Sequence, residues 1–315
     1  MRLGSHALRH HWGEHPSDAI QAETQLLASG GSFSIEAGGG SSASLATDAS
    51  AKGLKAGSLV QISGGSFDLD CADDAIHSDD AIVIENGSFQ LRTGDDAVHG
   101  EESLSILGGE LEISTSYEGI ESKELLIEGG QIRVLSSDDG VNGAGGVDGS
   151  GGPPGPPIQG DYWLHITGGR VVVNARGDGI DVNGSIEMSD GVVLVNGPTE
   201  AMNGPLDYDR SFNISGGTLI AVGSSNMAQA PSTSSTQNSI LLRSNTTRQA
   251  GTLIHLRSAN GTELFTFKPE KAFQSVVFSS PALVSGSYSL SFGGSHSGTE
   301  EDGLYSGGSY TPGTL

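Results

Sequence analysis

Acidic side chains recur at a fixed spacing in the middle of this chain, and several of them are neighbouring pairs. The pairs are Asp73-Asp74, Asp95-Asp96 and Asp138-Asp139, and single acids at the second position of the pair are Glu118, Asp178 and Glu200. If the repeats stack, the carboxylates form a column in which charges about 5 Å apart repel by roughly 3 kcal/mol at an effective dielectric of about 20. A bound cation relieves that repulsion, and Ca²⁺ suits such a site because it accepts about 6–8 oxygen ligands.

The sequence therefore predicts Ca²⁺ as a cofactor held by carboxylates of this column. The predicted metal ligands are Asp73, Asp74, Asp95, Asp96, Glu118, Glu121, Asp138, Asp139 and Asp178. The alternative is that each Asp only fills a turn, where its side chain bonds to nearby backbone. A turn role explains one repeat well, but it explains less well an acid that is kept at one offset through successive repeats.

A second set of polar residues lies three positions beyond the acids. It consists of Lys55, His77, His99, Glu121, Asn142, Asp181 and Asn203. We expect His77, His99 and Asn142 to contact a ligand from an exposed polar surface, together with Tyr117, which precedes Glu118. Transition-metal binding by the two histidines is the alternative, because imidazole is a common metal ligand.

The paired carboxylates could also perform catalysis. Two carboxylates can hydrolyse a glycosidic bond, and an acid that works with a basic group can abstract the α-proton of a uronate. No Lys or Arg lies among the acid pairs and the three positions after them, and Lys123 comes just beyond. Because a lyase needs such a base, we expect no catalytic residues. A lyase, a glycosidase, or a structural or adhesive surface protein are the alternatives to a binding function.

A repeated unit must place these side chains next to one another. It opens with a Gly turn at Gly65, Gly87, Gly109 and Gly130, at spacings of 22, 22 and 21 residues, and a fixed period of this kind is typical of repeat proteins. Between the turns, apolar residues alternate with polar ones, which predicts strands, and there is no helical period. The Leu-x-x-Leu-x-Leu frame of leucine-rich repeats is missing. We therefore expect an all-β fold, a right-handed parallel β-helix of ~22-residue coils.

The repeat is interrupted twice and ends before the C-terminus. The predicted divisions are a disordered leader at 1–17, the β-helix at 18–223 with loop excursions at 38–50 and 143–160, a linker at 224–239, an antiparallel β-module at 240–292 and a Gly/Ser-rich tail at 293–315. The module contains longer alternating runs and an Asn260-Gly261 hairpin turn. We expect it to cap the β-helix, because an open end of a repeat array exposes strand edges.

Composition limits the choice of partners. The formal net charge is −23, which argues against nucleic acid because no basic patch can replace its counterions. The single cysteine, Cys71, excludes an intrachain disulfide. No apolar run reaches the roughly 20 residues of a membrane-spanning helix, so we expect no membrane span, and the first residues show no signal peptide.

Four histidines, His6, His10, His11 and His15, precede the repeat. His11 and His15 are four positions apart and could share a helix face as metal ligands. A frayed leader is the simpler interpretation.

Several motifs in the repeats identify a family resemblance. They are AKGLKAG at 51–57, ADDAIH at 72–77, GDDAVH at 94–99, SYEGIE at 116–121 and SDDGVNG at 137–143, with GGTLI at 216–220 and MAQAP at 227–231. Together they resemble the bacterial secreted or cell-surface β-helix proteins described as carbohydrate-binding domain-containing proteins. The resemblance implies a fold like that of pectate lyases, calcium binding, and binding of acidic plant polysaccharide such as polygalacturonate without established catalysis. It also implies an extracellular or cell-surface location.

Members of that family usually have further coils before the point that matches Asp18. We therefore expect either that this chain is a fragment, or that its first coil is covered by residues 1–17 or by a partner.

Overall fold

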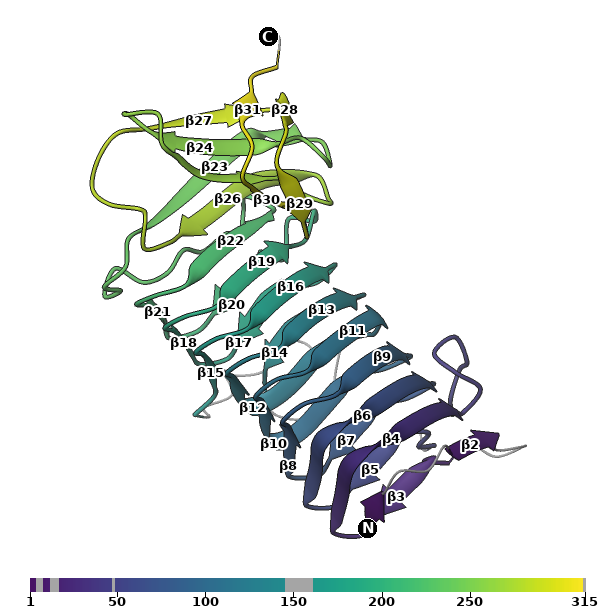
Figure 1. Cartoon of the computed structure of the whole chain (residues 1–315). Helices are drawn as coiled ribbons and strands as arrows, with labels where there is room; N and C mark the ends of the chain where they lie inside the picture. Colours follow the sequence, from purple (N-terminus) through teal and green to yellow (C-terminus); the bar gives the residue numbers. More distant parts are fainter. Residues whose placement is uncertain (4–7, 12–16, 47–48, 145–160, 314–315) are drawn as a thin grey trace.

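The computed structural model describes residues 1–3, 8–11, 17–46, 49–144 and 161–313. These residues form strands and no helix, so the prediction of an all-β fold is confirmed. Figure 1 shows most strands stacked one after another along a single axis, with residues 239–311 gathered at the end opposite the N-terminus. The larger sheet has 24 strands, mostly in parallel pairs, and a separate 5-stranded sheet is antiparallel. Since the described part of the chain is helix-free, it offers no apolar helix long enough to cross a bilayer.

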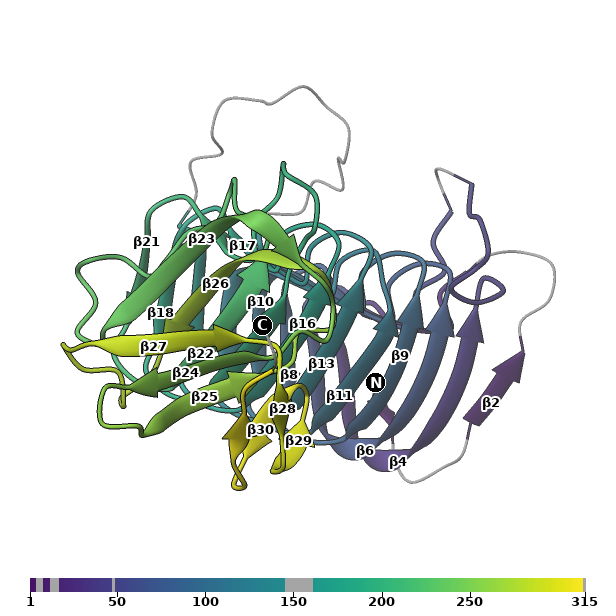
Figure 2. The same ribbon diagram turned by 90° about the horizontal axis from the view of Figure 1, so that it is seen from above.

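Three ladders of parallel strands run along the stack, and each regular repeat adds one strand to each ladder. The long ladder comprises β2 (Leu8–His11), β4 (Gln25–Ala37), β6 (Leu59–Cys71), β9 (Ser88–Thr93), β11 (Glu110–Thr115), β13 (Gln131–Ser136), β16 (Arg170–Ala175), β19 (Val192–Asn196) and β22 (Thr218–Gly223). Figure 2 shows these strands side by side from above.

The short ladder follows the long one after a turn, and the third ladder completes the repeat. The short ladder comprises β3 (Ile20–Ala22), β5 (Leu54–Ala56), β7 (Ile76–Ser78), the start of β10 (Val98–Ile106), the start of β12 (Ile120–Ile127), β14 (Val141–Gly143), β17 (Ile180–Val182) and β20 (Asp207–Tyr208). The third ladder comprises β1 (Arg2–Leu3), the first parts of β4 and β6, β8 (Ala81–Ile84), the ends of β10 and β12, β15 (Trp163–Ile166), β18 (Ser185–Met188) and β21 (Ser211–Ile214).

The core is built from equivalent apolar residues stacked on one another. In the long ladder the rings of Phe33, Phe67 and Phe89 lie parallel, with 4.9 Å between neighbouring centroids. The short ladder contributes Ile76 and Val98, which are fully buried. Burying a side chain of this size stabilises the fold by about 1.5–3 kcal/mol. Because every repeat presents the same inward positions, each one buries its apolar face against the next.

The Gly that opens each repeat is required by a close approach of backbones. Gly109 has a φ of +95°, and a Cβ there would come within 2.8 Å of the carbonyl oxygen of Gly87. A side chain would therefore be strained in conformation and would also collide with the preceding repeat.

The C-terminal strands close the end of the stack. β26 (Phe273–Ser279) pairs antiparallel with β22, and β23 (Ser239–Arg248) pairs with β26 on its other side. The separate sheet contains β24 (Ile254–Ser258), β25 (Glu263–Phe267), β27 (Tyr288–Phe292), β29 (Thr299–Glu301) and β30 (Leu304–Ser306), and β28 (Ser295–His296) pairs with β31 (Tyr310–Thr311). A second apolar core lies between the 24-stranded sheet and the 5-stranded sheet, and in it the ring of Phe265 from β25 contacts that of Phe278 from β26.

The ends of the chain have more regular structure than the sequence suggests. β1 and β2, within the expected leader, both pair with β4, so they cover part of the first repeat. His11 lies in strand β2 and not on a helix, while His6 and His15 fall outside the described residues. In the expected linker, the backbone N–H groups of Ser232 and Gln237 donate to carbonyls of β21. The expected tail supplies β28 to β31.

The two loop excursions are described to different extents. Within 38–50, residues 38–46 and 49–50 are described, and the N–H of Ser41 donates to Asp70 Oδ1 at 2.7 Å. Of the second excursion, 143–160, only residues 143–144 belong to the described part of the chain.

Candidate functional site

The acids predicted to line up do so at the corner between the long and the short ladder. Each lies two residues before a short-ladder strand, and that strand pairs in register with its counterpart in the next repeat. We call this set the acid column: Asp18, Asp74, Asp96, Glu118, Asp139 and Asp178, with Lys52 between the first two. The outer row, three positions later, is Lys55, His77, His99, Glu121, Asn142, Asp181 and Asp207.

The prediction is wrong for the last positions of the column. Glu200 and Asn203 are not aligned with Asp178 and Asp181. Instead, Gly204 donates its N–H to Asp178 Oδ1, and Asp207 is paired with Asp181. Asn196 and Asp207 are four positions farther apart than their register partners Asn174 and Asp181, and residues 200–202 lie in an exposed turn. Counting at a constant repeat length therefore assigns the wrong residues to the positions after Asp178.

Several column acids accept a backbone hydrogen bond from the next repeat. Asp74 Oδ1 accepts from the N–H of Asp96 at 3.2 Å, and Asp96 Oδ1 accepts from the N–H of Glu118 at 3.1 Å. The N–H of Asp178 donates to Asp139 Oδ1 at 2.6 Å. One carboxylate oxygen of each of these acids thus accepts a hydrogen bond from a backbone N–H of a turn, as the turn-filling alternative predicts. The second oxygen remains for a cation, a base or a ligand.

At the N-terminal end of the column, the acids are neutralised by a lysine. Lys52 Nζ lies 2.7 Å from Asp73 Oδ1 and 2.6 Å from Asp74 Oδ2. Burial opposes the charged form of Asp74, but the hydrogen bond from His77 and the charge of Lys52 outweigh it and hold the pKa of Asp74 below its usual range. Burial likewise opposes the charge of Lys52, and the two carboxylates raise its pKa above normal. Asp73 and Asp74 thus already have a cation, while Asp73, Asp74 and Asp95 also offer ligand oxygens within 4.8 Å of one another.

The histidines of the outer row are buried, which corrects the expectation of an exposed polar surface. His77 is 5% exposed and His99 is 2% exposed. His77 Nδ1 lies 2.8 Å from Asp74 Oδ2, and His77 Nε2 lies 3.0 Å from Asp79 Oδ1. The two imidazole rings meet edge to face, with 5.1 Å between centroids. Neither ring is placed to contact a large ligand directly.

The middle of the column is less well neutralised. Glu118 is half-buried, and Asn142 Nδ2 donates to its Oε2 at 2.6 Å. Burial, reinforced by the charge of Glu121, raises the pKa of Glu118 to about 8. Burial and the charge of Asp74 raise the pKa of Asp96 well above normal. Tyr117 and Asp95, at the preceding position, are both partly exposed, and the backbone N–H of Tyr117 donates to the carbonyl of Asp95.

The C-terminal part of the column forms a compact carboxylate cluster. Asp139, Asp178 and Asp181 each offer one oxygen, and these atoms all lie within 4.8 Å of one another. Burial and the neighbouring carboxylates raise the pKa of Asp139 to about 9 and that of Asp181 to about 7. Burial also raises the pKa of Asp178 to about 6. Among the described residues, no Lys or Arg forms an ion pair with any of these three acids.

Gly177 allows these acids to come together. A Cβ at this position would lie 2.3 Å from both Asp138 Oδ1 and Asp139 Oδ1. Any side chain at 177 would therefore displace the two carboxylates. The sequence predicted three members of this region, Asp138, Asp139 and Asp178, as metal ligands. It did not include Asp181 among the candidate ligands and did not single out Asp207 at all, although Leu206-Asp207-Tyr208 repeats the pattern of Ile180-Asp181-Val182.

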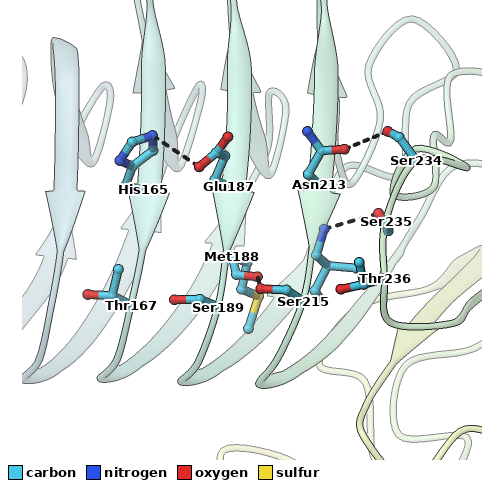
Figure 3. Close-up of a pocket in the computed structure, with 11 residues that line it drawn as sticks. His165, Thr167, Glu187, Met188, Ser189, Asn213, Ser215, Ser234, Ser235 and Thr236 are labelled. Atoms are coloured by element: carbon cyan, nitrogen blue, oxygen red, sulfur yellow. Dashed lines mark hydrogen bonds and ion pairs between the residues drawn. The ribbon is translucent and has the colours of Figure 1, made fainter.

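A separate trough of about 230 Å³ crosses the third ladder near its C-terminal end. Figure 3 shows His165, Glu187 and Asn213 in a row on successive strands, with Ser234 beyond them. His165 Nε2 lies 3.7 Å from Glu187 Oε2, and Ser234 Oγ donates to Asn213 Oδ1 at 2.6 Å. The trough is lined by hydroxyl, amide and carboxylate groups, so it can exchange hydrogen bonds with the hydroxyl groups of a sugar.

The geometry gives no support to proton abstraction by a lysine at the Asp73-Asp74 pair. The basic side chain that lies against them, Lys52, is held in its charged form by two carboxylates, so it is a poor base near neutral pH.

Comparison with known proteins bears on the same region. A family model described as carbohydrate-binding domain-containing protein matches residues 14–97 and 82–154. This part of the chain is similar to carbohydrate-binding domains. The match covers most of the acid column, and it supports a carbohydrate-binding domain with a non-catalytic role. Comparisons with curated proteins and with solved structures give no match.

Proposed function

We propose that this protein binds acidic polysaccharide, such as polygalacturonate or a similar pectin, without catalysis and through Ca²⁺. The observation that carries the proposal is the cluster of Asp139, Asp178 and Asp181, whose oxygens lie within 4.8 Å of one another. Two charges at about 4–5 Å repel by roughly 3–4 kcal/mol at an effective dielectric of about 20. A divalent cation turns that repulsion into attraction.

The fold that would present this site is a right-handed parallel β-helix. Three ladders of parallel strands, visited in the same order in each repeat, support this topology. Right-handedness follows from the general rule for crossovers between parallel strands. The C-terminal antiparallel module would be its cap, as the pairing of β26 with β22 suggests.

Calcium can join an acidic protein to an acidic glycan. Ca²⁺ takes about 6–8 oxygen ligands, and three aspartates cannot fill that shell with one oxygen each. The remaining positions are open to water and to the carboxylates of uronic acid residues. The net charge of −23 would otherwise repel such a polymer, so binding should depend strictly on the ion. An extracellular or cell-surface location, where Ca²⁺ and such glycans are available, fits this role.

The test is affinity electrophoresis through gels that contain polygalacturonate, with Ca²⁺ or with excess EDTA. We expect retardation with Ca²⁺ and none with EDTA. Asp139→Asn and Asp181→Asn should each weaken retention at least 10-fold, because an amide keeps the shape of the side chain and removes its charge. Retention that is unchanged in EDTA would refute the bridging mechanism.

Glu200→Gln is the matched control. It removes one negative charge at a position that the constant spacing assigned to the column and that the structure places in an exposed turn. We expect retention equal to that of the unsubstituted protein.

The same preparations separate the alternative functions. Unsaturated products or new reducing ends after incubation with polygalacturonate would indicate a lyase or a glycosidase. Calcium-dependent melting without retention on any glycan would indicate a structural or adhesive protein in which the ions only stiffen the strands.

A further inference from the structure

One ring nitrogen of the outer row is buried without a hydrogen-bond partner. His99 Nε2 is inaccessible to solvent and makes no hydrogen bond, although the side chain is 2% exposed overall. A buried polar atom without a partner is destabilising, because it has lost its hydrogen bonds to water and has gained none in the protein. The repeat unit does not require this arrangement, because the equivalent ring one repeat earlier, His77, has a carboxylate oxygen within 3.0 Å of each nitrogen.

The unpartnered nitrogen faces two carboxylates that lie too far away for hydrogen bonds. Glu101 Oε1 and Glu121 Oε2 are each 3.9 Å from His99 Nε2. Bonds from a zinc-like ion to imidazole nitrogen and carboxylate oxygen measure about 2.0–2.2 Å. In tetrahedral geometry one ion holds two such atoms about 3.4 Å apart, so each carboxylate has to move about 0.5 Å closer to His99 Nε2 to share an ion with it.

The other nitrogen of the same ring is oriented by a carboxylate. His99 Nδ1 lies 3.4 Å from Asp96 Oδ2. Metal-binding histidines commonly direct their second nitrogen to a carboxylate, which fixes the ring and strengthens the ligand. Asp96, His99 and Glu121 are all buried and offer ligand atoms within 4.8 Å of one another.

From these contacts we propose a second metal site, distinct from the Ca²⁺ cluster, which holds one divalent ion of the zinc class. Its ligands are His99 Nε2 and the carboxylates of Glu121 and Glu101, and water completes the shell. Asp96 positions the His99 ring. Glu101, whose side chain is 34% exposed, marks the side from which the ion enters.

The ligand set selects against Ca²⁺. Calcium binds oxygen almost exclusively, whereas zinc and its neighbours in the first transition row bind imidazole well. The site is independent of the glycan-binding proposal, so either can fail without the other.

Metal binding is tested on the full-length chain in which His6, His10, His11 and His15 are replaced by glutamine, since those histidines could bind zinc themselves. Metal-free protein is titrated with Zn²⁺ in competition with a chromophoric chelator, and with Co²⁺ by visible absorption. We expect one equivalent of either metal per chain, with no displacement by millimolar Ca²⁺. The visible absorption bands of the Co²⁺ form should have the positions and intensities expected for mixed nitrogen and oxygen ligands.

Two variants assign the ligands, a third tests the positioning acid, and a fourth serves as a matched control. His99→Gln and Glu101→Gln should each lower Zn²⁺ affinity at least 10-fold, and the exposed position of Glu101 makes its variant safe for folding. Asp96→Asn should lower Zn²⁺ affinity about 10- to 100-fold, because Asp96 orients the ring of a ligand without binding the ion itself. His77→Gln, in the same row but with both nitrogens satisfied, should change affinity less than 3-fold. Absence of a stoichiometric site, equal binding by His99→Gln or Glu101→Gln, or displacement by Ca²⁺ would overturn the proposal.

Discussion

Individual acids in this column have different roles, although they occupy equivalent positions. Asp74 is 1% exposed and contacts both Lys52 and His77, so its charge is compensated within the protein. Asp139 lies among other carboxylates, and no Lys or Arg of the described residues is paired with it. A buried carboxylate is tolerated only when a cation, hydrogen bonds or a proton compensates it. The partner of each acid therefore decides whether it serves stability or cation binding.

Lys52→Met should be strongly destabilising. It removes the cation from Asp73 and Asp74, which are 8% and 1% exposed. Removal of one partner from a buried ion pair costs about 3–5 kcal/mol, because the remaining charge is left uncompensated. The free energy of unfolding from urea titrations, followed by circular dichroism, measures the loss.

Lys55→Met is the control for that substitution. Lys55 Nζ is 3.9 Å from Asp18, so its loss should cost about 1 kcal/mol or less. Adding Asp74→Asn to Lys52→Met should restore part of the stability. If Lys52→Met were as stable as the unsubstituted protein, the lysine could not be the counterion of the pair.

The elements are held in place by contacts between segments that are distant in sequence. The turn between β29 and β30 reaches back to the long ladder, where Asp302 Oδ1 lies 2.8 Å from Arg133 Nε and Asp302 Oδ2 lies 2.7 Å from Arg170 Nε. Burial opposes the charge of Asp302, but the two guanidinium groups outweigh it and lower its pKa. These ion pairs connect the C-terminal sheet to β13 and β16 of the long ladder.

Asp302→Asn should loosen the turn between β29 and β30 without altering its shape. Asp302 has a φ of +51°, a conformation that asparagine also adopts readily, so the change removes mainly charge. Hydrogen bonds to charged groups contribute about 1.5–3 kcal/mol each, and hydrogen exchange of residues 299–306 should accelerate accordingly. Glu301→Gln should leave exchange unchanged, because only the backbone carbonyl of Glu301 accepts from Arg170. Equal exchange in Asp302→Asn and Glu301→Gln would contradict the role of the ion pairs.

At the scale of the whole molecule, the repeats align equivalent acids of a chain whose formal net charge is −23. Column position and burial together raise the pKa values of Glu118, Asp139, Asp178 and Asp181 to about 8, 9, 6 and 7. Their ordinary values are about 4. The folded protein therefore retains protons that the unfolded chain has already released.

The metal-free protein should become less stable as pH rises from about 4 towards 9. In that window the folded state binds more protons than the unfolded state, so stability falls with pH. Opposite shifts do not cancel the effect. The lowered pKa of Asp74 acts only below about pH 4, burial lowers the pKa of the single residue His255, and burial lowers the pKa of Lys271 to about 8, so Lys271 acts only at the upper end of the window. Melting temperatures in EDTA should fall across the window, and Ca²⁺ should flatten the decline because it replaces the protons. A melting temperature that is constant or rises with pH in EDTA would contradict this prediction.

The sequence by itself determined the features that depend on local pattern. The alternation of apolar residues, the Gly turns and the 22-residue spacing predict strands, core residues and the alignment of Asp74, Asp96, Glu118, Asp139 and Asp178. These follow from the sequence because strand periodicity and turn chemistry are properties of a few consecutive residues, and stacking repeats them.

The tertiary structure alone decided which groups meet across repeats and loops. The longer connection after β19 shifted the register, so Gly204 and Asp207 took the places expected for Glu200 and Asn203. Asp302 meets Arg133 across 169 residues. The burial of His77 and His99 likewise depends on contacts between neighbouring repeats. No local pattern specifies these contacts, because loop length sets the register and packing sets which side chains lose their water.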